Sequence, residues 1–179
     1  MATIYQDIDV HYAIDRIQTI LDCGILNRKY ELTESAFIEV MIRLSDLLQR
    51  ADSLGKRIRF KDDVKLFPPN AKGRHGVRDI TDAIRECRDA VCHPQANGHY
   101  ITPEGYPKPP RAPKDNCAQM TFGMTRGKTK WIKTPQYTIE SDYEDDVCFF
   151  FGAHRIYLNR HIKRAFKELK PIFPLRSFR

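Results

Sequence analysis

The chain has 179 residues, of which 41% are hydrophobic and 30% are charged, and its formal net charge is +7. This composition is typical of one folded domain and excludes a largely disordered chain. The longest apolar run, residues 147–151, is far shorter than the ~20 residues of a membrane span, and the N-terminus lacks the pattern of a secretory signal. We therefore expect neither a membrane protein nor a secreted one.

The positive charge gathers in two segments. Residues 155–179 contain eight lysines and arginines against one acid, and residues 56–88 contain ten against five acids. Residues 140–146 form an acidic patch instead. Such segregation is typical of proteins that bind nucleic acid, although a basic helix can also be only a solvated face. The charge permits a nucleic-acid partner without demonstrating one.

The cysteines are odd in number and scattered, unlike the disulfide framework of a small secreted protein. We therefore expect reduced thiols in a cytoplasmic protein. No C-x-x-C pair is present, so we expect no metal and no cofactor. The five cysteines are Cys23, Cys87, Cys92, Cys117 and Cys148.

Three helices are predicted in the first half of the chain. Apolar residues recur every three or four positions over residues 10–21, where Gly24 ends the stripe, and over residues 37–54, with Thr33 as the expected N-cap. A basic connector follows, and a third stripe occupies residues 77–91. The proline after His93 ends this third helix, because the residue before a proline is pushed out of helical geometry.

The chain then changes character. Residues 94–113 contain six prolines and two glycines, so we expect no regular element there. Residues 117–125 and 129–133 predict two strands around a turn, and residues 137–140 and 146–151 are two further candidate strands.

A last helix completes the prediction, with Asn159 as its N-cap, an apolar stripe over residues 162–169 and Pro171 at its end. Four amphipathic helices can bury one another. The predicted fold is therefore mainly α, a four-helix up-and-down bundle with a small β-rich insertion before the last helix. Whether the insertion packs on the bundle or stands apart is left open. We assign a single domain, residues 1–179, with a helical core at about 3–95 and 158–171 and the insertion at about 96–157.

The end of the third helix carries the sharpest motif, Arg88-Asp89-Ala-Val-Cys-His93-Pro94. On an ideal helix Arg88 and His93 lie about 140° apart and do not meet. Pro94, however, forces His93 out of the helix, so its ring can turn towards the arginine. The helix C-terminus favours the protonated imidazole by up to ~1–2 kcal/mol, and Asp89 adds attraction of the same sign and can fix the tautomer.

An imidazole that gains and loses a proton beside a permanently charged guanidinium suits phosphodiester cleavage without a metal. His93 would act as general base or acid on a ribose 2′-hydroxyl or on the leaving oxygen. Arg88 would hold the phosphate and stabilise the charge that develops on its oxygens. RNA supplies its own nucleophile, so the chemistry needs no serine or cysteine.

This pattern of an arginine, a polar residue, three further positions and a histidine at a helix end resembles the HEPN superfamily. The resemblance covers roughly residues 1–95 and 158–171. It implies a metal-independent endoribonuclease of a toxin–antitoxin or phage-defence system. It also implies a homodimer that pairs two motifs in one cleft, with an antitoxin or another protein as a possible further partner. Arg88 and His93 would be the catalytic residues and Asp89 the polar residue beside the arginine. Toxins silenced by nucleotide transfer have a tyrosine where this chain has Gln95, so we do not expect that control.

Alternatives stay open. The motif could be only a solvated helix face, with Arg85 and Asp89 as an ordinary ion pair and His93 as a C-cap. The chain could be a non-catalytic HEPN-like module that binds RNA or protein, or a bundle whose β-rich insertion docks a protein. A second arginine–histidine pair, Arg155 and His161, lacks the polar residue and the helix end, so we interpret it as a chance match.

Candidate RNA contacts lie on the third helix, the last helix and the predicted strands. Trp131, Tyr137 and Phe122 are interleaved with basic residues and could stack on bases, or they could cover the core of a small sheet. The acidic residues 142–146 could bind a cation or form only a solvated or partner-facing turn. The predicted RNA-binding residues are Arg85, Lys128, Lys130, Trp131, Arg160, Lys163 and Arg164.

Overall fold

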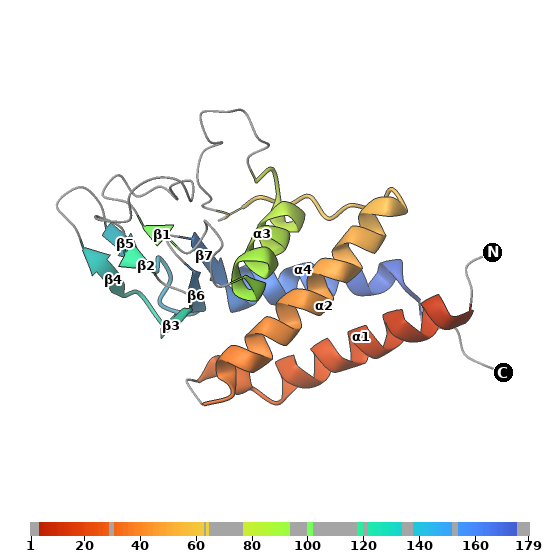
Figure 1. Ribbon diagram of the computed structural model, residues 1–179, viewed down its shortest axis with the longest axis horizontal. Coiled ribbons are helices and arrows are strands. Elements are labelled where there is room, and N and C mark those ends of the chain that lie inside the picture. The colour runs from red at the N-terminus through yellow and green to blue at the C-terminus, as the bar shows by residue number, and fades with distance from the viewer. Residues whose placement is uncertain are drawn as a thin grey trace.

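The computed structural model describes residues 4–28, 31–62, 64, 77–93, 100–101, 118–119, 122–133, 138–151 and 154–174. Within them the chain is mostly helical, with four helices and a small three-stranded antiparallel sheet that precedes the last helix (Figure 1). The mainly helical fold and the position of the strands confirm the coarse prediction. None of the described helices is long and apolar enough to cross a membrane.

Helices α1 (Ile4–Asp22) and α2 (Thr33–Ser53) form the predicted first pair. Gly24 ends α1 as expected, with a φ of 74° that other residues rarely adopt. The prediction for Thr33 is wrong. It is the first residue of α2 rather than its cap, and its hydroxyl donates to the carbonyls of Ile25 and Arg28, at 3.3 and 3.0 Å. Thr33 therefore anchors the preceding loop instead of the helix N-terminus.

Helix α3 (Ile80–Cys92) begins three residues later than the apolar stripe indicates. Asp79 is its N-cap, and the Asp79 carboxylate accepts a hydrogen bond from the backbone N–H of Asp82. The connector from α2 is tied to this start, because the N–H of Ile80 donates to the carbonyl of Phe60 and the hydroxyl of Thr81 donates to that of Ile58. These bonds fix where α3 starts.

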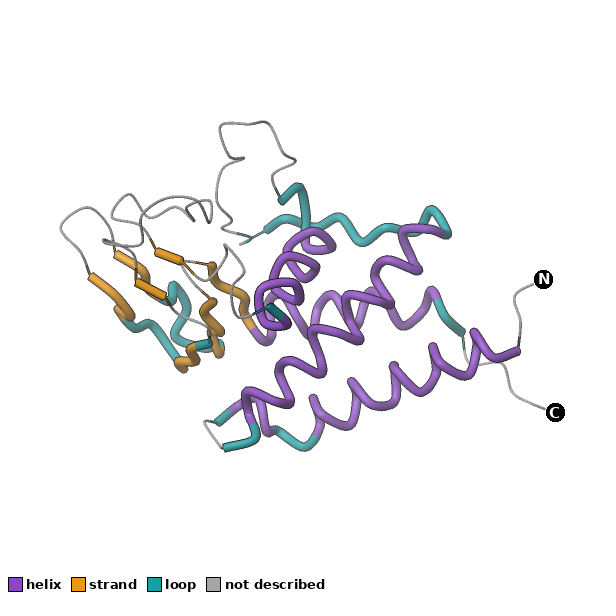
Figure 2. Tube along the Cα trace, in the orientation of Figure 1, coloured by secondary structure: helices purple, strands orange, loops and turns teal. Residues whose placement is uncertain are grey.

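Seven short strands lie between α3 and the last helix in the described part of the chain. β3, β6 and β7 form the three-stranded sheet in the order β3-β6-β7, while β1 pairs with β2 and β4 with β5, all antiparallel (Figure 2). Their bounds are Tyr100–Ile101 (β1), Ala118–Gln119 (β2), Gly123–Arg126 (β3), Lys130–Lys133 (β4), Thr138–Glu140 (β5), Val147–Phe151 (β6) and His154–Tyr157 (β7).

Three details of the strands differ from the prediction. Residues 117–125 contain two strands rather than one, and β3 and β4 flank the turn at Gly127 without pairing with each other. Two strands were not predicted: β7, and β1, which lies in the proline-rich segment where no element was expected. The cause is common to all three: strand partners are chosen by contacts distant in sequence, which a local pattern does not contain.

The strands pack on the helices rather than standing apart. All five residues of β6 are buried, and the Phe149 ring stacks on Phe37 of α2 with centroids 4.4 Å apart. Val147, Phe151 and Ile156 belong to the same hydrophobic cluster as the apolar faces of α1, α2 and α3. The segment expected to be an insertion therefore supplies part of the core.

The last helix begins as a π-helical segment (Leu158–Lys163), continues as α4 (Arg164–Leu169) and ends in a short 3₁₀ turn (Lys170–Ile172). The prediction that Asn159 caps it is wrong. The buried carboxylate of Asp146 accepts the backbone N–H groups of Asn159 and Arg160, at 2.9 and 3.1 Å. A side chain from the turn before β6 thus caps the helix from outside.

Candidate functional site

The C-terminal end of α3 has the backbone geometry that the motif predicts. Cys92 is the last helical residue, and His93 is extended, with φ −127° and ψ 96°. The N–H of His93 donates to the carbonyl of Ala90 at 3.2 Å, and the His93 side chain is exposed. The imidazole therefore stands outside the helix, at its C-terminal end.

Arg88 lies on the last turns of α3 with its side chain 35% exposed. Its Nη1 donates to Oδ1 of Asp89 at 2.8 Å, and that bond raises the pKa of the guanidinium, with a further contribution from Asp46 on α2. Its Nε is buried and has no hydrogen-bond partner among the described residues. The structure thus brings Asp89 to the arginine, while its predicted role towards His93 stays a prediction.

The simplest alternative for this helix face assigned Asp89 to Arg85. The structure instead pairs Arg85 with Asp82, Nη2 to Oδ1 at 3.4 Å, and leaves the Arg85 side chain 44% exposed. Asp82 is buried and is bound more closely by Arg57 and Arg78, each at 2.7 Å. Arg85 therefore remains a surface cation one turn before Arg88.

The second arginine–histidine pair lies inside the molecule. His161 is buried, and its Nδ1 accepts the backbone N–H of Tyr157 at 3.1 Å. Arg155 lies 3.6 Å from the carboxylate of Asp142 and donates to the carbonyl of Glu140. A buried imidazole cannot reach an RNA strand, which supports the interpretation of this pair as a chance match.

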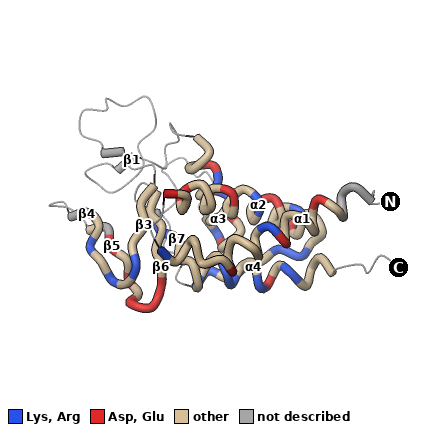
Figure 3. Tube along the Cα trace, turned by 90° about the horizontal axis from the view of Figure 1, so that it is seen from below, with Lys and Arg blue, Asp and Glu red and all other residues tan. Residues whose placement is uncertain are grey.

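Two arginines of the last helix that were predicted to bind RNA are held by acids of the chain. Arg160 contacts Asp145 at 2.9 Å and Asp146 at 3.2 Å, and Arg164 contacts Asp62 and Glu168, each at 3.0 Å. Figure 3 shows basic and acidic residues interspersed along the helices rather than separated onto one side. Much of the positive charge of this helix is therefore neutralised within the molecule.

The candidates on the strands divide into core and surface. Phe122 is partly buried and packs against the core, 5.4 Å from Phe37, ring centre to ring centre, as in the alternative in which it covers the core of the sheet. Lys128, Lys130 and Trp131 are exposed. Lys163 is half-buried, and Tyr137 lies outside the described residues. Among the described candidates on the strands and their turns, the exposed ones therefore lie in the turn after β3 and at the start of β4.

The acidic residues 142–146 serve the fold. Asp142 accepts a hydrogen bond from the Tyr157 hydroxyl at 2.9 Å, and Asp145 and Asp146 bind Arg160. In the part of the chain that the structure describes, no group of His, Cys, Asp or Glu side chains is arranged to hold a metal ion. These contacts account for the acidic patch without a cation.

A buried ionic cluster at the start of α3 was not predicted. Arg57, 8% exposed, donates to Asp79 and to Asp82, each of them also nearly inaccessible, over 2.8 and 2.7 Å. The hydrogen bond to Asp79 raises the pKa of Arg57 despite burial, and bonds to Asp82 and Asp52 add to the effect. From the sequence, Asp79 could be recognised only as a residue type that caps helices, because its partner Arg57 lies 22 residues away.

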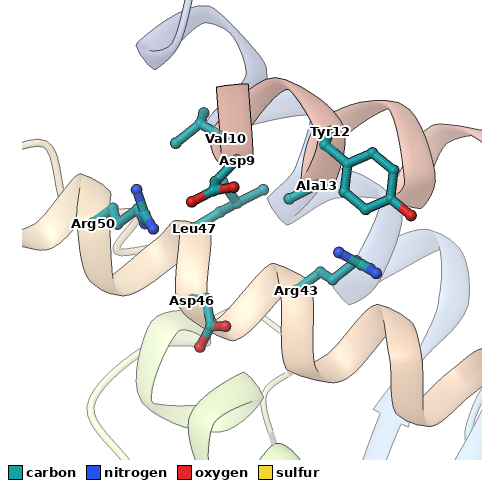
Figure 4. Close-up of a pocket in the computed structure, with 8 residues that line it drawn as sticks. All are labelled: Asp9, Val10, Tyr12, Ala13, Arg43, Asp46, Leu47 and Arg50. Carbon is teal, nitrogen blue, oxygen red and sulfur yellow. The ribbon is translucent and has the colours of Figure 1, made fainter. Parts of the chain in front are cut away.

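An open hollow of about 270 Å³ lies between α1 and α2. In Figure 4 the Asp9 carboxylate lies between Arg50 on one side and Arg43 with Tyr12 on the other. The guanidinium of Arg43 lies 5.0 Å from the centroid of the Tyr12 ring. Asp46 also lines the hollow, and its carboxylate points towards α3. After Asp89, the charge of Asp46 helps to raise the pKa of Arg88, so α2 contributes to the electrostatics of the candidate site.

Comparison with known proteins adds no constraint. The sequence matches no protein-family model, and no curated protein or solved structure is significantly similar to it.

Proposed function

We propose that the protein is a metal-independent endoribonuclease in which Arg88 and His93 act on a phosphodiester of RNA. The observation that carries the proposal is the placement of these two residues at the C-terminal end of α3. His93 leaves the helix with an exposed imidazole, and Arg88 lies five positions earlier with a partly exposed side chain. Pro94 accounts for the extended backbone of His93, but the buried Nε of Arg88, which has no hydrogen-bond partner among the described residues, is unusual for a side chain that only faces solvent.

The proposed reaction uses the 2′-hydroxyl of the substrate as nucleophile. His93 accepts the proton of this hydroxyl while the 2′-oxygen forms a bond to phosphorus. The bond from phosphorus to the 5′-oxygen breaks, and that oxygen takes a proton from water or from a second imidazole. Arg88 neutralises the charge on the non-bridging oxygens. The products are a 2′,3′-cyclic phosphate and a 5′-hydroxyl, and the balance needs no metal and no other cofactor.

The finer fold assignment belongs to this proposal. The order of three helices, a β-rich segment and a last helix, with the motif at the end of the third helix, is consistent with a HEPN-like up-and-down bundle. The resemblance carries with it a homodimer with two motifs in one cleft. It also carries a cytoplasmic role as a toxin or phage-defence effector, possible partners being an antitoxin or another protein. The second imidazole would then come from the other subunit.

The test is cleavage of a single-stranded RNA oligonucleotide by purified protein in EDTA. We expect His93→Ala to lower the rate by about 100-fold or more, the usual contribution of a general acid–base group. Arg88→Ala should lower it by a similar factor, because the charge that develops on the phosphate oxygens loses its stabilisation. Arg50→Ala is the matched control, because Arg50 is an exposed arginine on another helix, and it should cleave at the wild-type rate. Since both motif side chains reach solvent, their variants should stay folded by circular dichroism.

Two results would contradict the proposal. Cleavage that survives both substitutions would remove Arg88 and His93 from the reaction. Salt-sensitive RNA binding without turnover, unchanged in His93→Ala, would favour the non-catalytic binding module, for which the ion pair between Arg88 and Asp89 is the supporting observation.

A further inference from the structure

Trp131 is the only tryptophan of the chain and lies at an irregularity of β4. Lys130 pairs with Glu140 and Ile132 pairs with the adjacent Ile139, so Trp131 is the extra residue of a β-bulge. A bulge re-aims the side chain of the extra residue and is often found beside functional sites. The bulge directs the indole onto the three-stranded sheet rather than leaving it along the edge of β4.

The indole packs on that sheet, against Phe150 of β6 and Gly123 of β3. It lies parallel to the Phe150 ring, with centroids 5.3 Å apart and an interplanar angle of 10°. Phe150 pairs with Gly123 on β3, and a Cβ at Gly123 would come within 2.7 Å of the indole. Glycine at this position therefore lets the ring lie flat. The ring is fixed on one side by the sheet, and 38% of the residue remains exposed.

Three basic residues precede Trp131 within five positions of the chain. Arg126, Lys128 and Lys130 are all exposed, and within the described residues neither lysine makes an ion pair. The nearby acids are mostly engaged. Asp142 lies against Arg155 and Asp145 against Arg160. Glu144 accepts the backbone N–H of Lys128 at 3.5 Å, and Glu140 is opposite Lys130 on β5.

We propose that Trp131 is a stacking platform for an unpaired base of single-stranded RNA, with Lys128 and Lys130 contacting the flanking phosphates. This inference rests on the proposed function and deepens it by naming unpaired RNA as the substrate. A fixed aromatic ring beside flexible cations is the arrangement with which single-strand binders hold nucleic acid, and it tolerates any base because every base has a π-face. A base inside a duplex is already stacked and is not available to the ring.

The experiment follows the fluorescence of Trp131, which has no other tryptophan signal to obscure it. The His93→Ala variant is titrated with a 12-nucleotide RNA of mixed sequence, and in parallel with the same strand annealed to its complement. We expect saturable quenching by the single strand and at least tenfold weaker binding of the duplex. Lys128→Gln and Lys130→Gln should each reduce the slope of log K against log salt by about 0.7, because each variant neutralises one phosphate fewer.

Variants separate stacking from charge. With a dye-labelled RNA and anisotropy as the readout, Trp131→Leu should weaken binding by about tenfold or more. Gly123→Val, which keeps the tryptophan but fills the space in which the indole packs, should weaken binding in the same direction and shift the tryptophan emission. Tyr12→Leu is the matched control, because Tyr12 is an aromatic residue 60% exposed on α1. It should bind as the parent does.

The outcomes are separable from those of the cleavage test. Absent quenching, equal quenching by duplex, or unchanged affinity of Trp131→Leu would each overturn the platform, and a folded Trp131→Leu that binds RNA normally would leave a protein-docking role for this surface. If quenching persists while Arg88→Ala and His93→Ala cleave normally, the platform stands and the proposed catalytic pair fails.

Discussion

Arg57 is the side chain through which the connector after α2 holds the start of α3. It is 8% exposed, and so is Asp79, while Asp82 is 4% exposed. Burying three charges is favourable only while each has its partners, because removing one leaves the others uncompensated in a medium of low dielectric. The cluster therefore sets the position of α3, and with it the position of Arg88 and His93.

Arg57→Met should lower the free energy of unfolding by about 3–5 kcal/mol, because buried Asp79 loses the guanidinium that binds it and Asp82 keeps only Arg78 and Arg85. Urea denaturation followed by circular dichroism measures the effect. Arg59→Met is the control: Arg59 is exposed two residues away, and its replacement should change the free energy by less than about 0.5 kcal/mol. Equal urea midpoints for the two variants would contradict the assigned role of the cluster.

The same cluster predicts how stability depends on pH. Burial by itself would raise the pKa of Asp82, but hydrogen bonds from Arg78 and Arg57 outweigh it and hold this pKa well below the ordinary value of 3.8. Around and below pH 4 the unfolded chain therefore binds a proton at Asp82 that the folded chain does not. Stability conferred by Asp82 is complete above that range and is lost as the pH falls.

Urea midpoints measured from pH 6 to pH 3 should accordingly fall for the wild type. Asp82→Asn should be less stable at pH 6 and should show a smaller fall, since the variant has no carboxylate to protonate at this position. A pH dependence as steep in Asp82→Asn as in the wild type would show that other acids, and not this one, set the acid limit of the fold.

At the scale of elements, the last helix depends on a carboxylate outside it. Asp146 is fully buried, accepts two N–H groups of the first helical turn and also binds the guanidinium of Arg160. Asp146→Ala should cost roughly 2–3 kcal/mol, because it removes both a helix cap and hydrogen bonds to a charged group. Asp145→Ala, at a site 74% exposed, and Asn159→Ala should each cost less than about 1 kcal/mol in thermal or urea unfolding. A larger loss from Asn159→Ala would restore Asn159 as the cap.

Element type was readable from the sequence where the cause is local. Apolar spacing of three and four residues predicted the helices, and Pro94 correctly placed the departure of His93 from α3. Caps were misassigned where the true partner is distant. Thr33 and Asn159 look like local caps. The Thr33 hydroxyl instead donates to the carbonyl of Ile25, and the backbone N–H of Asn159 donates to the carboxylate of Asp146. The pairing of β3 with β6 was likewise unreadable, because it joins residues 21–27 positions apart.

The candidate site was predicted in part. The helix end and the two exposed residues of the motif followed from Arg88, His93 and Pro94 alone. The bond between Arg88 and Asp89 was not expected, because adjacent positions on a helix do not ordinarily face each other. Charge counts alone did not show that Arg160 and Arg164 have acidic partners within the chain, up to 102 residues away.

At the scale of the whole molecule, α2 is the element on which the others pack. Its apolar side is buried against α1, α3 and β6, and Phe37 stacks on Phe149 across that contact. The strands thus continue the helical core, and β4 lies at one end of the molecule (Figure 1). Lys130 and Trp131 of this strand and Lys128 before it are exposed. In the proposed function, the net charge of +7 would act on RNA chiefly through such exposed lysines, since Arg160 and Arg164 are paired with acids of the chain.

The chemistry of the product ends tests the proposed catalytic pair most directly. A single-stranded RNA and the same sequence with 2′-O-methyl riboses are incubated with the wild-type protein in EDTA, and the fragments are identified by mass spectrometry. Catalysis by Arg88 and His93 predicts fragments ending in a 2′,3′-cyclic phosphate with 5′-hydroxyl partners, and an intact 2′-O-methyl strand. Fragments with 3′-hydroxyl ends, or cleavage of the methylated strand, would contradict attack by the 2′-hydroxyl and with it the proposed roles of both residues.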